Sequence, residues 1–319
     1  TLTETTVGVM VTKILLVDHV TTTTQKMVDV LMELDLLQEL VTTQVEAATD
    51  ATETEIVAMV MVITETDSRG VATVTLNNAD KHNAFDDQLI AQISATFDAL
   101  EADLGVRIVI LQATGRSFSA GADLAWMRRM ADYSYEENHR DATLMAAMFR
   151  RINTLSKPTI ARVHGAAFGG GVGLAAVCDL VFATPAASFC LSEVKLGLIP
   201  AVISPFVVAA IGPRAARRFC MTAERFSAAT ALELGLVSEL CEEAELDNRI
   251  QAIIEKLLIN GPAAMAASKE LVADVAGAPI NDELVAETSR RIAEIRGSDE
   301  GREGLNAFLE KRRASWIGD

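Results

Sequence analysis

The chain has 319 residues, of which 28 are Lys or Arg and 44 are Asp or Glu, so its formal net charge at pH 7 is −16. Half of the residues are hydrophobic, more than a disordered chain carries, which predicts a soluble globular protein. The acidic balance and the lack of a Lys- and Arg-rich run exclude electrostatic binding to nucleic acid or to an anionic membrane.

Membrane insertion and secretion are not predicted either. The longest apolar stretches fall well short of the ~20 residues that cross a bilayer. No basic cluster precedes an apolar stretch at the amino end, so no signal peptide is expected. The four cysteines form no C-x-x-C pair and predict reduced thiols rather than a disulfide framework or a zinc site, at Cys178, Cys190, Cys220 and Cys241. These features predict a cytoplasmic protein.

Residues 1–60 differ in composition from the rest of the chain. They carry ten acidic and two basic residues, contain no Pro, Arg, Phe, Trp or Tyr, and are rich in Thr. One helix is predicted by the apolar spacing over residues 25–41. A β pattern ending in Asp18 weakly resembles the phospho-acceptor strand of a receiver domain, but no second acidic residue adjoins it. We interpret residues 1–60 as an atypical acidic, Thr-rich extension, partly disordered or not native to the protein.

From Met61 onward the sequence alternates strand patterns, glycine turns and helix patterns. β-type alternation and short apolar runs predict strands at 71–76, 107–112, 158–163 and 180–184. Helical spacing predicts helices at 86–100 and 136–155, and a short helix opened by the glycines 169–171. After about residue 205 the β pattern stops, and helices are predicted at 213–221, 227–235, 245–259, 263–275, 281–296 and 299–313. This order predicts an α/β core over residues 61–255 and a C-terminal helical region over 256–319.

Two glycine-containing turns, 117–123 and 164–174, each follow a predicted strand and open a helix. Glycine lets the backbone approach a ligand closely, and the free N–H groups of a first helical turn attract negative charge. Two such turns facing one atom would form an oxyanion hole. The alternative is that the glycines only permit tight packing. Neither turn fits a dinucleotide-binding loop, and no G-K-[ST] of a P-loop occurs.

Five segments in register resemble the crotonase superfamily, the enoyl-CoA hydratase and isomerase family. They are NADKHNAF at 78–85, FSAGAD at 118–123, the GGG-containing stretch 158–178, SEVKLGLIP at 192–200 and FLEKRRASW at 308–316. The resemblance covers residues ~65–319 and implies a spiral of ββα turns with a C-terminal helical trimerisation region, in a homotrimer or hexamer. It implies an acyl-CoA thioester substrate. No cofactor or metal is expected, since CoA enters as part of the substrate.

The resemblance also implies the site residues. The backbone N–H groups of Ala122 and Gly170, which follow Gly121 and Gly169, would form the oxyanion hole. Contacts to the nucleotide and phosphates of CoA carry over to four residues near the first turn, His82, Asn83, Ala84 and Ala120. Lys311 would reach the nucleotide of a neighbouring subunit. His164 is interpreted as a packing or hydrogen-bonding residue, with an auxiliary proton-carrying role as the alternative.

Hydratases of this family carry two glutamates, of which this chain has one. The second corresponds to Glu193, whereas Gly173 occupies the position of the first. A single carboxylate can run syn hydration, or it can move a proton between Cα and Cγ in double-bond isomerisation. Three functions therefore remain open: an enoyl-CoA hydratase of the lyase class, an enoyl-CoA isomerase, and a catalytically poor acyl-CoA binding protein. For Glu193 the alternative is an exposed, solvated side chain.

The AVISP run at 201–205, together with Gly173, resembles hydratases acting on methylglutaconyl-CoA and isohexenylglutaconyl-CoA (gamma-carboxygeranoyl-CoA), in leucine and acyclic terpene breakdown. Such substrates carry a second carboxylate, for which Arg128 and Arg129 are candidate partners. The alternative is a solvated helix face. Three apolar residues are expected to line the acyl pocket or to belong to the core, Trp126, Met127 and Met130. Asp123 is expected to cap the helix that comes after it.

Overall fold

The computed structural model describes residues 60–318. Apart from Val60, the predicted extension over residues 1–60 and its helix lie outside the described residues.

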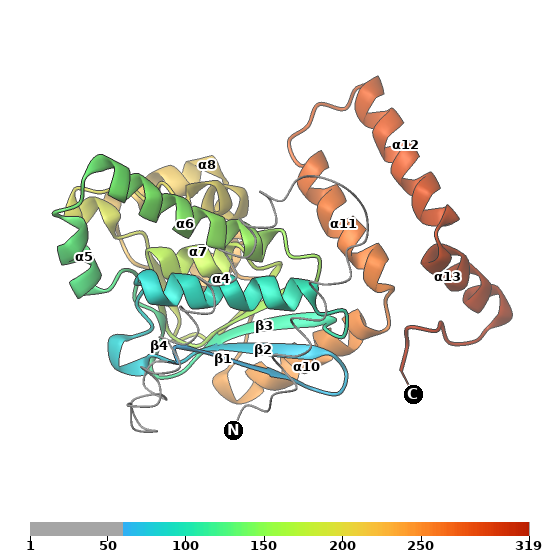
Figure 1. The fold of residues 1–319 in the computed structure, drawn as a ribbon. Coiled ribbons are helices and arrows are strands. Elements are labelled where there is room, and N and C mark those ends of the chain that lie inside the picture. The colour runs from blue at the N-terminus through green and yellow to red at the C-terminus, as the bar shows by residue number, and fades with distance from the viewer. Residues whose placement is uncertain (1–59, 319) are drawn as a thin grey trace, which may run out of the picture. The chain divides into compact units, whose positions relative to one another are not determined.

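The larger sheet has six strands in the order β1-β2-β3-β5-β7-β10 (Figure 1). β1 and β2 are antiparallel and the other neighbours are parallel. The strands are β1 (Val62–Thr66), β2 (Val71–Leu76), β3 (Ile108–Ala113), β5 (Thr159–Val163), β7 (Leu180–Ala183) and β10 (Glu239–Leu240). The four strands predicted from the sequence are confirmed as β2, β3, β5 and β7.

The smaller sheet has four short strands in the order β4-β6-β8-β9. β4, β6 and β8 are parallel, and β9 runs antiparallel to β8. The strands are β4 (Ser117–Ser119), β6 (Ala166–Phe168), β8 (Ser188–Cys190) and β9 (Phe226–Ser227). One residue of each strand is buried in the main core, and these are Phe118, Ala167, Phe189 and Phe226.

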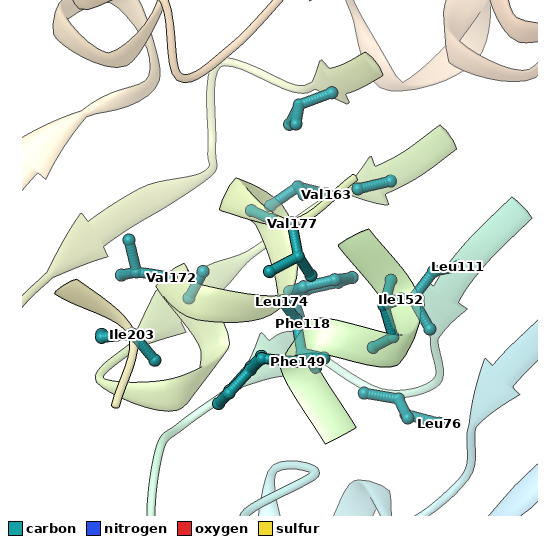
Figure 2. Packing of buried hydrophobic residues seen from close by; sticks show 14 of the residues in the cluster. Leu76, Leu111, Phe118, Phe149, Ile152, Val163, Val172, Leu174, Val177 and Ile203 are labelled. Carbon is teal, nitrogen blue, oxygen red and sulfur yellow. The ribbon is translucent and has the colours of Figure 1, made fainter. Parts of the chain in front are cut away.

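The main core lies between the six-stranded sheet and the helices α4 (Asp87–Ala102), α6 (Tyr135–Asn153) and α7 (Gly170–Ala176). Figure 2 shows Val172 and Leu174 of α7 among side chains from the surrounding strands and helices. Each large side chain buried in this way contributes roughly 1.5–3 kcal/mol. The predicted helices 86–100 and 136–155 are confirmed, as is the short helix after the glycines.

A second core lies on the other face of this sheet, against α10 (Glu243–Leu258). In β3, Ile108 and Ile110 face α10, whereas Val109 and Leu111 face the main core. Burial on both faces explains why this strand is a continuous apolar run in the sequence.

The remaining helices are α5 (Leu124–Met130), α8 (Ser204–Thr222), α9 (Ala228–Leu234), α11 (Pro262–Val275), α12 (Asp282–Gly297) and α13 (Asp299–Glu310). α13 is tied to the start of α11, because the Glu300 carboxylate accepts hydrogen bonds from the backbone N–H groups of Ala263 and Ala264. α10 runs through the predicted boundary at residue 255. Within the described part of the chain, no helix combines the length and the apolar character needed to cross a membrane. The predicted trimer or hexamer stays a prediction.

Two sequence predictions after residue 205 are wrong in detail. The β pattern does not stop there, because β9 and β10 lie beyond it; each has two residues, too few to produce a detectable alternation. α8 begins at Ser204, earlier than the predicted helix at 213–221, and has a break at Gly212, just before Pro213. The proline and the positive φ of Gly212 explain why the sequence pattern shows only the second half.

Candidate active site

The two glycine turns and Glu193 lie along one edge of the four-stranded sheet. β4, β6 and β8 are parallel, so their carboxyl ends share this edge. The first turn follows β4, the second turn follows β6, and Glu193 lies three residues after the end of β8. The antiparallel β9 begins at the same edge. In α/β folds this is where ligands bind.

The two glycine turns are in contact. A Cβ placed on Gly121 would lie 3.2 Å from the carbonyl oxygen of Phe168 and 3.9 Å from the Cα of Gly169. Gly121 and Gly169 also have φ angles of +89° and +50°, which disfavour any residue with a side chain. Ala122 and Gly170 directly follow these glycines, so their amides are neighbours across the contact.

Neither of these two amides is used within the fold. Phe85 forms a parallel bridge with Ala122, in which the N–H of Phe85 donates to Gly121 O and that of Asp123 donates to Phe85 O, both at 2.7 Å. The N–H of Ala122 therefore points away from Phe85. Gly170 is the first residue of α7, where an N–H has no intrahelical acceptor. Among residues 60–318 neither amide has a recorded acceptor.

Glu193 begins the 3₁₀ helix η2 (Glu193–Leu196), and its carboxylate faces the second turn. Its Oε1 would lie 3.2 Å from a Cβ on Gly169. Its Oε2 is buried and has no hydrogen-bond partner within the described residues. Burial raises the pKa of this carboxyl above its ordinary value. The alternative of an exposed, solvated glutamate is wrong.

At Gly173 the space for a side chain is already filled. A Cβ there would lie 2.4 Å from Ile203 Cγ2 and 3.0 Å from the Phe149 ring. Figure 2 shows Ile203 and Phe149 in the same packed cluster as Val172 and Leu174 of α7. Gly173 is buried, and these two side chains occupy the space that a side chain at this position would need.

The segment predicted to contact the nucleotide lies beside the first turn. His82 and Asn83 both have left-handed backbone conformations, and His82 O accepts a hydrogen bond from Ala120 N at 2.9 Å. The His82 ring lies between Arg116 and Ser117, at 3.1 and 3.2 Å. His82 and Ala120 are partly exposed, whereas Ala84 is 6% exposed.

Asn83 was predicted to contact the substrate, but the structure places it inside the protein. It is fully buried, and its side-chain amide donates to the carbonyls of Thr114 and Ser117 at 2.9 and 3.0 Å. Its side-chain oxygen accepts from Asn78 N at 2.8 Å. Asn83 therefore holds the His82 segment against the first turn and offers no atom to a ligand.

Asp123 caps α5 as predicted, since its carboxylate accepts from the N–H groups of Ala125 and Trp126. Burial acts to raise the pKa of Asp123, but these hydrogen bonds and the Lys81 ammonium outweigh it and lower the pKa. Trp126 is 3% exposed and donates from its ring nitrogen to Asp141 at 3.1 Å. Trp126 is thus a core residue rather than a wall of an open pocket.

The two predicted carboxylate-binding arginines differ. Arg129 forms an ion pair with Asp87 at the start of α4, so its charge already has a partner. Arg128 is exposed on α5 and has no ion pair in the described part of the chain. Both side chains are exposed, which fits the interpretation of a solvated helix face.

Lys311 ends α13 in a left-handed conformation and is exposed. Figure 1 draws α13 apart from α5 and α7, so a contact of Lys311 with a nucleotide would need a second subunit and stays a prediction. His164 Nε2 interacts with Gly115 O at 2.8 Å. This contact supports the packing role predicted for His164.

Two contacts in this region were not predicted from the sequence. Ile203 fills the space beside Gly173, and the Arg225 guanidinium lies over the Phe168 ring, 4.6 Å from its centre. Both contacts join residues far apart in the chain, which a local pattern does not reveal.

Comparisons with known proteins identify the family of the chain. Residues 66–319 match the family model described as enoyl-CoA hydratase/isomerase. A putative enoyl-CoA hydratase from Thermus thermophilus is 36% identical over 244 residues, which are 76% of this chain and 95% of that protein. The crystal structure of an enoyl-CoA hydratase from Shewanella pealeana is 46% identical, covers 83% of this chain and 100% of its own, and has a TM-score of 0.79.

A putative enoyl-CoA hydratase/isomerase (crotonase) from Legionella pneumophila is also 46% identical, covers 80% of this chain and 98% of its own, and has a TM-score of 0.75. These likenesses confirm the predicted crotonase-like α/β fold with its C-terminal helices. The family model covers most of the chain and includes both turns and Glu193. The chain belongs to the enoyl-CoA hydratase/isomerase family.

Proposed function

We propose that the chain is an acyl-CoA hydratase, which adds water to a 2-enoyl-CoA through a thioester enolate. The observation that carries the proposal is the position of Glu193. Its half-buried carboxylate, whose Oε2 has no hydrogen-bond partner within residues 60–318, lies against the second glycine turn, which in turn contacts the first. Membership of the enoyl-CoA hydratase/isomerase family supports the same chemistry.

The two free amides would stabilise the enolate. As hydroxide adds at Cβ, negative charge moves onto the thioester oxygen, where the N–H groups of Ala122 and Gly170 donate to it. Donors fixed by the backbone need no reorganisation during the reaction, and the loss of one donor in comparable sites costs roughly 3–4 kcal/mol. A backbone donor needs no particular side chain, which explains alanine and glycine at these positions.

Glu193 would move the proton. Its carboxylate takes a proton from water as the oxygen bonds to Cβ, and it then returns that proton to Cα on the same face of the enolate. Burial raises the pKa of Glu193 and so makes its carboxylate a stronger base for the first step, the removal of a proton from water. The site then needs no second carboxylate, consistent with Ile203 filling the space beside Gly173.

For the acyl group we propose a branched, carboxylated enoyl chain, with 3-methylglutaconyl-CoA as the first candidate. The support is the combination of Gly173 with the AVISP run at 201–205, in which Ile203 is the residue that packs on Gly173.

The Glu193→Gln variant tests the mechanism. We expect its kcat for hydration to fall by about 10³-fold, within the range for loss of a general acid-base group. The assay is the loss of conjugated enoyl-thioester absorbance with 3-methylglutaconyl-CoA and crotonyl-CoA. The matched control is Glu65→Gln, an exposed glutamate on β1, which should retain full activity. Unchanged hydration by Glu193→Gln would exclude the single-carboxylate mechanism.

A second candidate function is double-bond isomerisation. One buried carboxylate suffices to move a proton between Cα and Cγ, and the same enolate is formed. Appearance of conjugated absorbance from a 3-enoyl-CoA, without hydration of the 2-enoyl product, would favour the isomerase. Tight binding of acyl-CoA without either reaction would identify a binding protein instead.

A further inference from the structure

Arg225 lies at the same edge of the four-stranded sheet as the proposed active site. It directly precedes β9, and β9 begins at the edge where β4, β6 and β8 end. The neighbouring residue Phe226 is buried in the main core, so Arg225 faces the opposite side of the sheet. Phe168 lies on that same side, because its neighbour Ala167 is the core residue of β6.

The guanidinium of Arg225 is held in place without a counter-ion. It lies over the Phe168 ring at 4.6 Å, a cation-π contact that orients the group and leaves its N–H donors free. Phe168 is the residue immediately before the second glycine turn. Across residues 60–318 no carboxylate pairs with Arg225, although the chain has an excess of 16 negative charges.

A second cation lies nearby. Burial raises the pKa of the Cys190 thiol at the end of β8, the charges of Lys195 and Arg225 act to lower it, and the charge of Glu193 acts to raise it. Lys195 is exposed and also has no ion pair within the described residues. Lys195 and Arg225 therefore bring two positive charges to this end of the edge, neither of them in an ion pair with a carboxylate of residues 60–318.

The strand order places these groups in a sequence that matches an extended substrate. The nucleotide-side residue Ala120 follows β4, the free amides lie at the turns after β4 and β6, Glu193 follows β8, and Arg225 precedes β9. Neighbouring strands are about 4.8 Å apart, so β9 lies roughly 10 Å from β6. The four bonds from the thioester carbon to the far carboxylate of a five-carbon chain span about 5 Å, and the arginine side chain can cover the rest.

We propose that Arg225 binds a carboxylate at the far end of the acyl chain and thereby selects thioesters of dicarboxylic acids. This inference rests on the proposed function for the direction in which the acyl chain runs. It differs from the sequence prediction, which placed this role on Arg128 and Arg129 in α5. Arg129 already pairs with Asp87, whereas Arg225 has no ion pair among residues 60–318 and lies over Phe168, next to the second turn.

The experiment compares two non-reacting ligands of equal shape, glutaryl-CoA and its neutral isostere 5-methylhexanoyl-CoA, by titration calorimetry. We expect the wild-type protein to bind glutaryl-CoA more tightly. In Arg225→Gln the ratio of the two dissociation constants should shift against glutaryl-CoA by 10- to 100-fold, the usual range for a charge-assisted hydrogen bond. Arg225→Lys should restore part of the preference. Arg217→Gln, at an exposed arginine of α8, is the matched control and should keep the wild-type ratio.

Three results would overturn the proposal. The wild-type protein could show no preference for glutaryl-CoA, Arg225→Gln could keep the wild-type ratio of dissociation constants, or the preference could be lost in Arg128→Gln instead of in Arg225→Gln. The proposed function fails separately. A wild-type protein that hydrates crotonyl-CoA without preferring glutaryl-CoA contradicts the carboxylate site and the carboxylated acyl chain, but leaves the hydratase in place. One that loses its glutaryl-CoA preference in Arg225→Gln, but hydrates no enoyl-CoA, contradicts only the hydratase.

Discussion

The two β-sheets of the molecule differ in strand length, in burial and in the groups that lie at the ends of their strands. Except for the two-residue β10, the strands of the six-stranded sheet have four to six residues, and those at its centre are buried on both faces. The strands of the four-stranded sheet have two or three residues, and one face packs on the core. All the groups proposed to act on the thioester lie just before or just after strands of the smaller sheet.

This difference separates stability from chemistry. The larger sheet has apolar contacts on both faces, so its side chains contribute mainly to the free energy of folding. The smaller sheet contributes fewer contacts but fixes the positions of two free amides and one buried carboxylate. Variants in the first sheet should therefore change stability at constant activity, and variants at the edge of the second should do the reverse.

Leu111→Ala tests the first half of this comparison. Leu111 of β3 is 1% exposed in the main core, and Figure 2 shows it among the packed side chains. We expect the free energy of unfolding to fall by about 3 kcal/mol, from lost burial and a residual cavity. Urea unfolding measures the loss, and kcat of the folded fraction should match the wild-type value. A large drop in kcat at low urea would contradict the separation.

Gly169→Ala tests the second half. Its φ of +50° disfavours alanine, and the added Cβ would lie 3.2 Å from the Glu193 carboxylate. We expect kcat/KM to fall about a hundredfold, because the Gly170 amide and Glu193 both shift. Gly277→Ala is the matched control, since φ is +74° there and nothing lies within 4 Å of the new Cβ. Equal activity losses in both variants would mean that backbone strain alone is responsible.

The same contrast explains what the sequence could predict. Strands β2 and β3 were identified because alternation or a continuous apolar run is visible over six residues. Strands of two or three residues, such as β6 and β9, carry no such pattern. The turns of the site were found instead through their glycines and their family resemblance. Glu193 was predicted as the acid-base group from the same resemblance, whereas the burial of its carboxylate could be seen only in the structure.

Contacts between distant residues were not predictable. Asn83 belongs to a motif that suggested substrate binding, but its fully buried amide binds two carbonyls more than thirty positions along the chain. The packing of Ile203 on Gly173 and of Arg225 on Phe168 likewise depends on which strands and helices become neighbours. A motif identifies which segment is important, whereas the direction of each side chain depends on tertiary packing.

Gly173→Ala sharpens the comparison at the boundary between core and site. The new Cβ would lie 2.4 Å from Ile203 Cγ2, so we expect a loss of about 2 kcal/mol in unfolding free energy from overpacking. Ile203→Ala alone leaves a cavity and also destabilises. In the double variant the methyl group introduced by Gly173→Ala enters the space that the Ile203 side chain has left. The loss of unfolding free energy in the double variant should therefore be smaller than the sum of the two single-variant losses, by at least about 1 kcal/mol. Strict additivity would show that the two positions do not compete for space.

The smallest expected effect concerns the stability cost of Glu193 itself. Burial raises the pKa of this carboxyl in the folded protein above its ordinary value of 4.5. Well below pH 4.5 the carboxyl is protonated in both the folded and the unfolded state, so it does not lower the stability. Between pH 4.5 and the pKa of the folded protein, the unfolded chain loses this proton first, and the free energy of unfolding therefore falls as the pH rises. Above the folded pKa the cost is constant. Glu193→Gln removes this cost, so the variant should be more stable than wild type by about 1 kcal/mol at pH 8. Urea unfolding at pH 8 and pH 4 measures it, and a stability difference that does not shrink at pH 4 would mean that the ionised carboxylate bears no cost.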